Sequence, residues 1–273
     1  MRTDPYEGSD GLGIELVEGI LHLRLSRPAV RNAIDDEMMV GLIDAIDAAG
    51  RDEQVRAILI SGEGEHFCGG ADIVARNNRK EGAARPQVGS IQRRVPSLAH
   101  RLIPLLCSVQ VPLVCAVQGW AAGIGLHIAA AADLTVAASG ATFWEPFASR
   151  GFTPDSGATW LLPRRVGLPR ARELLLFGRR LSASEALEWQ LVDRVVPDAD
   201  LAVEAQSLVA EIASGPTVSL GLTKWLLHAG ASVSLDEQLR NEAFALELSS
   251  RSEDFREGLA AFKDRRPPVF KGR

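Results

Sequence analysis

The 273-residue sequence predicts an α/β protein in which a mostly parallel sheet is followed by an almost entirely helical region. Three observations support this fold class. Short β-branched runs alternate with amphipathic segments of helical period. Glycine-rich turns directly follow two of the runs, 55–60 and 112–117, as in repeated strand–turn–helix units. Helical periodicity dominates from about residue 167. We place a domain boundary near residue 200, which divides the chain into a core (1–199) and a helical oligomerisation region (200–273).

The composition is that of a globular protein with a large core, since 46% of the residues are hydrophobic and the net charge is −5. This mildly acidic balance disfavours nucleic acid and anionic membranes as partners. Three cysteines without a CxxC pair predict neither a disulfide framework nor a metal site. The polar N-terminus lacks a signal-peptide layout, so a cytoplasmic location is expected. The apolar stretch 111–138 contains Asp133 and many small residues, and we interpret it as buried core.

The chain begins with a predicted hairpin, because alternating runs at 14–17 and 20–25 flank Glu18-Gly19. A helix then starts at Asp35-Asp36 and ends at Gly50. The remaining elements of the core follow in order: a buried strand at 55–60, a polar surface loop or lid at 75–92, a helix at 91–108, a strand at 112–117, a glycine turn at 119–125, a helix at 126–132 and a strand at 134–137.

The last part of the chain is predicted to contain six helices and one strand. The helices are expected at 170–177, 182–189, 199–213, 218–229, 235–249 and 252–264, and the strand at 191–196. Ser182 and Glu185 form a capping-box pattern, while Asp236 and Ser252 are candidate caps. Helices with no sheet to cover usually pack on each other or on a neighbouring subunit, so we expect a homo-oligomer.

The two glycine-rich loops do not fit a nucleotide-binding motif. Gly119, Gly123 and Gly125 follow GxxxGxG spacing, and neither loop ends in the Gly-Lys-Ser/Thr of a P-loop. Both loops instead deliver backbone N–H groups to one edge of the sheet, the second at a helix N-terminus. Two such donors could form an oxyanion hole, whereas the alternative is a pair of tight turns that allow close packing.

Several segments occur together in a recognisable order: RPAVRNAI (27–34), HFCGGADI (66–73), VQGWAAGIGLHIAAAADLTVA (117–137), FTPDSGATWLLPRRVG (152–167) and EGLAAFKDRRPPVF (257–270). In this order they resemble the enoyl-CoA hydratase/isomerase (crotonase) superfamily over nearly the whole chain. The resemblance implies a crotonase-like spiral of ββα turns with a C-terminal helical trimerisation region. It further implies a homo-trimer or hexamer acting on an acyl-CoA thioester, with coenzyme A as part of the substrate and no permanently bound cofactor.

The resemblance assigns roles to particular residues. The thioester oxygen would lie between the backbone amides of Ala71 and Ile124, where most relatives have glycine at the second position. Isoleucine there could narrow the acyl pocket. The CoA-binding candidates, chiefly through backbone atoms, are Asn32, Ala33, Ala71, Asp72 and Ile73, with Phe262 and Lys263 supplied by a neighbouring subunit. Arg27 or Arg31 could bind the phosphates of coenzyme A. Alternatively, either arginine could be a solvated surface charge.

The sequence departs from the pattern of the hydratases, which hold water between two glutamates. The matching positions here are His127 and Phe147, and phenylalanine cannot transfer a proton. Glu145 lies two residues away and could substitute only if the local register shifts. His127 therefore remains a candidate catalytic residue, with packing on an alanine-rich helix as its alternative role.

Asp155 matches an aspartate that acts as the base in some isomerases and as the nucleophile in aryl-CoA dehalogenases of this superfamily. Its alternative role is to cap the helix that follows. His100 matches a histidine that assists the aspartate in the dehalogenases, although a histidine on an amphipathic helix is often a core-edge residue.

The leading hypothesis is double-bond isomerisation of an enoyl-CoA by Asp155, since one carboxylate can move one proton between two carbons. The alternatives are hydration by His127 with Asp155, dehalogenase-like attack by Asp155, and acyl-CoA binding without turnover. A bulky acyl group is expected, in a pocket lined by five aromatic residues: Phe143, Trp144, Phe147, Phe152 and Trp160.

Overall fold

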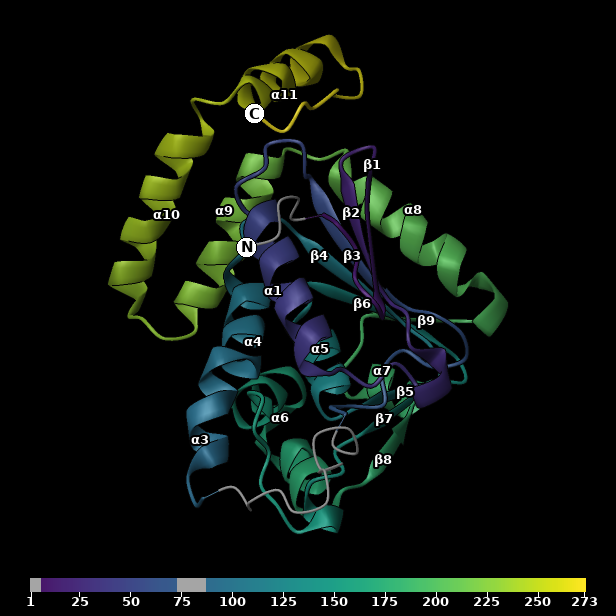
Figure 1. The fold of residues 1–273 in the computed structure, drawn as a ribbon. Helices are drawn as coiled ribbons and strands as arrows, with labels where there is room; N and C mark the ends of the chain where they lie inside the picture. The colour runs from purple at the N-terminus through teal and green to yellow at the C-terminus, as the bar shows by residue number, and fades with distance from the viewer. Residues whose placement is uncertain (1–5, 73–86) are drawn as a thin grey trace.

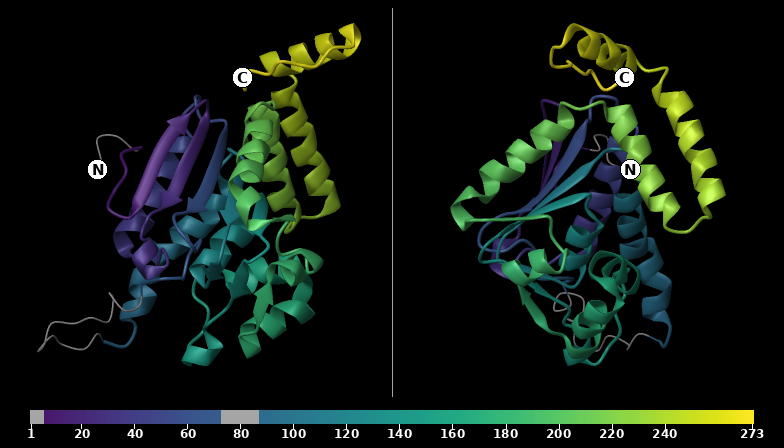
Figure 2. Two further views of the ribbon diagram at one scale, coloured as in Figure 1. Left: turned by 90° about the vertical axis from the view of Figure 1, so that its right-hand side faces the viewer. Right: turned by 180° about the vertical axis from the view of Figure 1, so that it is seen from behind.

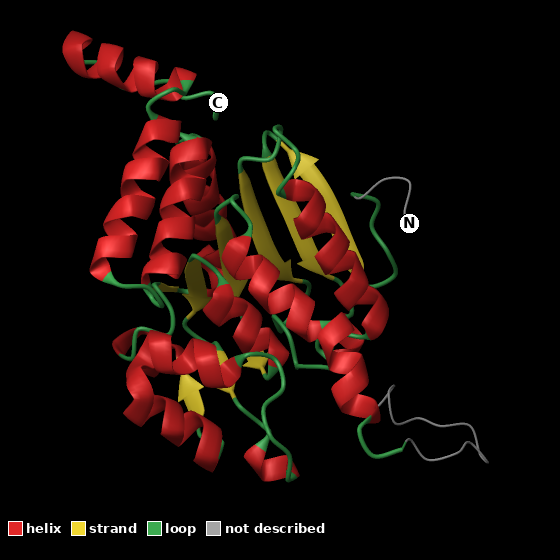
Figure 3. Ribbon diagram, turned by 90° about the vertical axis from the view of Figure 1, so that its left-hand side faces the viewer, coloured by secondary structure: helices red, strands yellow, loops and turns green. Residues whose placement is uncertain are grey.

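The computed structural model describes residues 6–72 and 87–273 (Figure 1). Its strands are β1 (Leu12–Val17), β2 (Ile20–Leu25), β3 (Ala57–Gly62), β4 (Leu113–Val117), β5 (Trp120–Ala122), β6 (Leu134–Ala138), β7 (Thr142–Trp144), β8 (Arg180–Ser182) and β9 (Arg194–Val196). A six-stranded sheet has the order β1-β2-β3-β4-β6-β9, with every pair parallel except the β1–β2 hairpin. A three-stranded sheet, β5-β7-β8, lies beside α7 (Figure 3).

The helices agree with the predicted order of strand–turn–helix units and a helical C-terminal region. They are α1 (Asp36–Ala49), α3 (Ser90–Arg94), α4 (Ala99–Ser108), α5 (Ile124–Ala131), α6 (Ala158–Phe177), α7 (Ala183–Glu188), α8 (Leu201–Ala213), α9 (Thr217–Gly230), α10 (Leu235–Ser249) and α11 (Glu253–Asp264). The α/β class expected from the sequence is therefore confirmed. Within the described ranges, no helix combines the length and the apolarity that a membrane span requires.

Several local predictions are confirmed by hydrogen bonds. Asp35 caps α1 by accepting from the Met38 amide at 2.9 Å, and Ser182 forms the predicted capping box with Glu185. Ser252 caps α11, but Ser234 rather than Asp236 caps α10.

Other local predictions were wrong at their boundaries. The helix expected over 91–108 is divided into α3, a 3-10 turn at Val95–Ser97 and α4, with Pro96 in the turn. The three-residue strands β5, β7 and β8 were missed, because three residues are too few to show a period. The predicted loop at 75–92 lies largely outside the described residues, and its end belongs to α3.

Two apolar cores sandwich the large sheet, because successive side chains of each strand point to opposite faces. On one face Ile58 and Ile60 join the core formed with α1, α4 and α5. On the other face Ala57 and Leu59 pack against α8 (Figure 2). The sheet thus holds α4 and α5 side by side at the carboxyl ends of β3 and β4, where the candidate site lies.

The C-terminal helices leave much of their apolar surface uncovered. Helix α10 packs along α9, and α11 lies at the far end of the molecule from α6 (Figure 1). Exposed apolar side chains gather on the last two helices, namely Leu235, Leu239, Phe244, Leu246, Leu248, Phe255, Leu259 and Phe262. Helix α9 is fixed to the core by Lys224, whose Nζ lies 2.8 Å from Asp133 Oδ2 and is almost fully buried.

We expect the Lys224→Met substitution to lower the free energy of unfolding by about 2 kcal/mol, since it removes one partner of a largely buried ion pair. The measurement is equilibrium unfolding in urea. The control is Arg51→Met, which breaks the exposed Arg51–Asp47 pair and should change stability by less than about 0.5 kcal/mol. Equal effects of the two substitutions would contradict the assignment of Lys224 as the tether of α9.

Candidate active site

The loop after β3 lies as an extra strand between two other segments. On one side the Cys68 amide donates to the Trp120 carbonyl at 2.8 Å, and the Cys68 carbonyl accepts from Ala122 at 2.9 Å. On the other side Ala71 forms a parallel bridge with Ile34, through bonds made by its neighbours Gly70 and Asp72. In such a bridge the central residue's own N–H points away from the partner strand, so the Ala71 amide faces the opposite side.

The second loop ends at Ile124, the first residue of α5. Gly123 has φ +51°, which turns the chain sharply into the helix. The first amides of a helix have no acceptor inside it, and the helix dipole makes this end positive. Among the residues described, neither the Ile124 nor the Ala71 N–H donates a hydrogen bond to a protein acceptor. These two amides are therefore free to bind an oxygen atom.

Gly125 brings the two loops together. A Cβ at this position would lie 2.6 Å from Cys68 Cβ and 2.8 Å from the Cys68 carbonyl oxygen, which is closer than real side chains approach. Only glycine lets the N-terminus of α5 contact the loop that carries Ala71. The side chain of Ile124 is buried in the main core and does not line the cavity described below, so the expected narrowing of the pocket is not seen.

His127 and Glu145 form a fully buried pair beside these amides. His127 Nε2 lies 2.9 Å from Glu145 Oε1, and both side chains have no exposed surface. His127 Nδ1 and Glu145 Oε2 have no hydrogen-bond partner in the described part of the chain. The sequence suggested each residue separately, but their contact joins α5 to the segment after β7 and has no signal in residue spacing.

Phe147 covers this pair. Its ring stacks on His127 with centroids 5.9 Å apart and planes at 9°, and its edge lies 3.7 Å from the position of a Gly123 Cβ. The Phe152 ring packs edge-to-face on Phe147, with the ring centroids 5.3 Å apart. Phe147 occupies the position that matches the second glutamate of the hydratases, and it places an apolar ring against His127.

Asp155 has an exposed side chain, and its Oδ1 accepts a hydrogen bond from Ser156 Oγ at 2.6 Å. It does not cap α6, because the N-cap is Gly157 and no side chain makes the cap hydrogen bond. The alternative role expected for Asp155 is thus not observed. His100 Nε2 lies 2.7 Å from the Asp155 backbone carbonyl oxygen, so the histidine contacts the main chain rather than the carboxylate.

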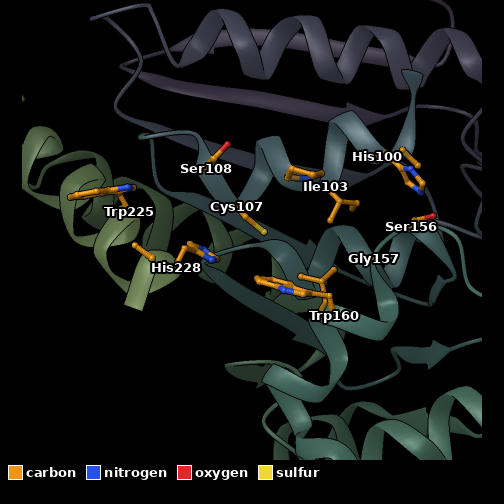
Figure 4. A pocket seen from close by; sticks show the side chains of 13 residues that line it. His100, Ile103, Cys107, Ser108, Ser156, Gly157, Trp160, Trp225 and His228 are labelled. Carbon is orange, nitrogen blue, oxygen red and sulfur yellow. The ribbon is translucent and has the colours of Figure 1, made fainter. Parts of the chain in front are cut away.

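A cavity of about 550 Å³ opens next to Asp155, between α4, α6 and α9 (Figure 4). Its lining is Ala99, His100, Ile103, Pro104, Cys107, Ser108, Ser156, Gly157, Trp160, Leu161, Trp225, His228 and Ala229. Of the five aromatic residues expected to form the pocket, only Trp160 lines it. Phe143 is fully buried in the core, and Trp144 stacks with Arg150 and Arg180. Trp225 and His228 come from α9, which sequence reasoning did not connect with the site.

The candidate CoA-binding residues fall into three groups. The Asn32 side chain is buried and clamps the loop by donating to the Glu63 and His66 carbonyls, so only its backbone can face a ligand. Phe262 and Lys263 are exposed on α11, at the opposite end from α6 (Figure 1). Ala33 and Asp72 flank the Ile34–Ala71 bridge, whereas Ile73 lies outside the described residues.

The two candidate arginines differ in their surroundings. Arg27 bonds Asp35 at 3.0 Å and Asp72 at 3.1 Å, so its charge is already neutralised by protein carboxylates. Arg31 is exposed, and no ion pair is found for it within residues 6–72 and 87–273. Of the two, Arg31 is the one available to a phosphate.

Cysteine chemistry does not contribute to this site. Burial raises the pKa of the Cys68 thiol to about 12, so that it stays protonated at neutral pH and is a poor nucleophile. Burial also raises the pKa of Cys107, which lines the cavity.

Comparison with known proteins places the chain and its fold in one family. A family model described as enoyl-CoA hydratase/isomerase matches residues 15–273. The 1,2-epoxyphenylacetyl-CoA isomerase of Escherichia coli K12 is 40% identical over 94% of this chain and 96% of its own length. A 4-chlorobenzoyl coenzyme A dehalogenase of Arthrobacter is 32% identical over 93% of this chain and 91% of its own length. The crystal structure of an enoyl-CoA hydratase from Bacillus anthracis superimposes with a TM-score of 0.88 at 29% identity, covering 96% of this chain and all of that one.

We expect Gly125→Ala to lower the free energy of unfolding by about 1–3 kcal/mol, because the added methyl group would overlap Cys68. Thermal and urea unfolding measure this loss. Gly258→Ala is the control, since this glycine also lies within a helix but a Cβ there meets only Phe270 at ordinary contact distance. An unchanged stability of Gly125→Ala would show that the two loops can separate without cost.

The buried pair generates a second stability prediction. His127→Leu and Glu145→Met should each cost about 3 kcal/mol, because each leaves one polar group buried without a partner. The double substitution should cost clearly less than the sum of the two, with a coupling energy of about 1–3 kcal/mol. Additive losses in urea unfolding would mean that the two side chains do not depend on each other.

Proposed function

This chain belongs to the enoyl-CoA hydratase/isomerase family, and on that premise we propose that it shifts the double bond of an enoyl-CoA thioester between the β,γ and α,β positions. The family supplies the acyl-CoA thioester as the substrate class. The observation that carries the finer proposal is the contrast in exposure between Asp155 and the His127–Glu145 pair. Asp155 is exposed and adjoins Ser156, which lines the cavity, whereas His127 and Glu145 are fully buried and do not line it.

The thioester carbonyl oxygen would bind between the Ala71 and Ile124 amides. When a proton leaves the carbon beside the carbonyl, negative charge develops on that oxygen. Two fixed N–H donors at a helix N-terminus stabilise this charge without reorganising, and one such donor is typically worth about 3–4 kcal/mol in the transition state. The close contact of Gly125 with Cys68 supports this role, because it fixes the relative position of the two donor segments.

Asp155 would move the proton. Its carboxylate removes a proton from C2 of a 3-enoyl thioester, which gives a dienolate and a protonated Asp155. The same acid then returns the proton to C4, so that the double bond ends between C2 and C3 and the enzyme is unchanged. His100 would act as a positioning residue through the Asp155 backbone carbonyl.

Hydration is the second candidate, favoured by the free Nδ1 of His127. Adding water requires an acid and a base on either side of a bound water molecule. The apolar ring of Phe147 stacks on His127 with an offset, which disfavours a water molecule beside that face of the imidazole. Dehalogenation by Asp155 attack on an aryl-CoA is a third candidate, favoured by the His100 contact with Asp155 and by the similarity to the Arthrobacter dehalogenase.

Coenzyme A would lie along the loop that contains Ala71, with backbone atoms of Asn32, Ala33 and Asp72 around it and Arg31 near its phosphates. The exposed apolar side chains of α10 and α11 support a homo-trimer or hexamer formed by residues 200–273. In such an assembly Phe262 and Lys263 would reach the CoA of a neighbouring subunit, since they cannot reach the site of their own chain.

Asp155→Asn should lower the rate of double-bond migration by about 10²–10⁴-fold, because the amide cannot accept and return the proton. The measurement is mass spectrometry of saturated, 2-enoyl and 3-enoyl thioesters incubated in heavy water, where migration is accompanied by deuterium uptake. Binding of a saturated thioester serves as the control for folding and should change little in the variant.

The other outcomes separate the candidates. Water addition that survives in Asp155→Asn would assign the chemistry to His127. An ester trapped on Asp155 with a halogenated aryl-CoA would identify a dehalogenase. Tight thioester binding with no mass change would identify a binding protein without turnover.

A further inference from the structure

The cavity beside Asp155 continues well beyond the place where the chemistry would occur. His100, Pro104, Cys107 and Ser108 recur at helical spacing and form one face of α4. At 1.5 Å per residue, the cavity wall from residue 100 to residue 108 is roughly 12 Å long. An acyl group whose reacting carbons lie near Asp155 therefore has room to extend toward α9 (Figure 4).

The middle of the cavity suits a flat ring system. Its walls are chiefly Ile103, Leu161, Ala229 and the indole of Trp160. The Arg164 guanidinium lies 3.9 Å from the centre of the Trp160 ring, which leaves the other indole face to the cavity. A volume of about 550 Å³ lies within the range of sites for drug-sized ligands, and a short straight acyl chain would leave most of this apolar surface unfilled.

The far end of the cavity carries a histidine without a partner. The ring of His228 points into the cavity, toward Cys107 and Trp160 (Figure 4). It is half-buried, and no hydrogen bond joins it to any residue in the described ranges. A half-buried imidazole in an apolar cavity loses hydration, and a ligand atom that hydrogen-bonds to it would recover that loss.

The groups around His228 favour its neutral form. Burial lowers the pKa of His228, and nearby Lys224 and Arg165 lower it further, while Asp133 opposes them. Asp133 is itself paired with Lys224 at 2.8 Å, and the Cys107 thiol stays protonated because burial raises its pKa. A neutral imidazole can donate one hydrogen bond and accept another, so it suits a neutral oxygen, whereas a carboxylate against these apolar walls would lose its hydration without gaining an opposite charge.

We propose that His228 is a specificity-determining residue that hydrogen-bonds a hydroxyl or carbonyl oxygen at the far end of a ring-containing acyl group. The proposal rests on the proposed function only for the orientation of the thioester, with its carbonyl between the Ala71 and Ile124 amides. It assigns the substrate class: acyl thioesters with an extended, fused-ring or aryl tail that ends in a neutral oxygen.

The test compares two saturated CoA thioesters that cannot react. One is a butanoyl thioester that ends in a naphthol ring, and the other replaces the distal hydroxyl by a methyl group of similar size. Calorimetric titration of the wild type should show about tenfold tighter binding of the naphthol compound, since a site that hydrogen-bonds a ligand hydroxyl disfavours the analogue without it.

His228→Leu should reduce this tenfold preference to about one, and His228→Gln, which keeps a hydrogen-bonding group, should retain part of it. The matched control is Thr223→Ala, which lies on α9 but not among the cavity residues and should keep the full preference. Circular dichroism of each variant reports whether it is folded.

A wild type without preference for the hydroxyl compound, or a His228→Leu variant that keeps the preference, would overturn the proposal. Failure of the proposed function has a different signature. In that case a 3-enoyl thioester would undergo no double-bond shift, while the binding preference and its dependence on His228 would remain.

Discussion

The contact between Cys68 and Gly125 is the constraint on which the candidate site depends. The loop carrying Ala71 and the helix start carrying Ile124 come from different strand–helix units, more than fifty residues apart in sequence. Parallel strands bring their carboxyl ends to one edge of a sheet, but that alone fixes two loops only approximately. Absence of a side chain at Gly125 allows backbone contact, and the hydrogen bonds of Cys68 with β5 fix the register of that contact.

The chemistry of this edge follows from which polar groups remain accessible. His127 and Glu145 bond each other without exposed surface, with one polar atom of each left unpartnered among the residues described, and the Phe147 ring stacks on His127. A buried pair of this kind contributes little net stability compared with apolar residues of the same volume. Its effect here is to fix the imidazole on which Phe147 stacks, and so the position of the Phe147 ring next to Gly123. Asp155, by contrast, remains exposed, because glycine rather than aspartate is the N-cap of α6.

The sequence allowed the elements and the backbone donors to be predicted, because both depend on local signals. Glycine spacing, strand runs and caps such as Asp35 and Ser182 each act within a few residues. The short strands β5, β7 and β8 were not predictable in this way, since each is defined by pairing with segments distant in the sequence. The partnership of His127 with Glu145 and the approach of His228 to the cavity also depend on packing between distant elements. The predicted aromatic pocket was partly wrong for the same reason, because proximity in sequence placed Phe143 in the pocket and packing places it in the core.

In the proposed function, the groups that act on the reacting end of the ligand and those that recognise its far end come from different elements. The amides of Ala71 and Ile124 are backbone groups, so they persist whatever side chains surround them, provided that Gly125 is kept. The far wall comes from α9, which is tied to the core by the Lys224–Asp133 pair and is continuous with α10 through a short turn. Under the proposed function, substitutions on α9 would change which acyl group fits without altering Asp155. Trp225 and His228 thus lie on the same helix hairpin as the exposed apolar side chains of α10, since α9 packs along α10.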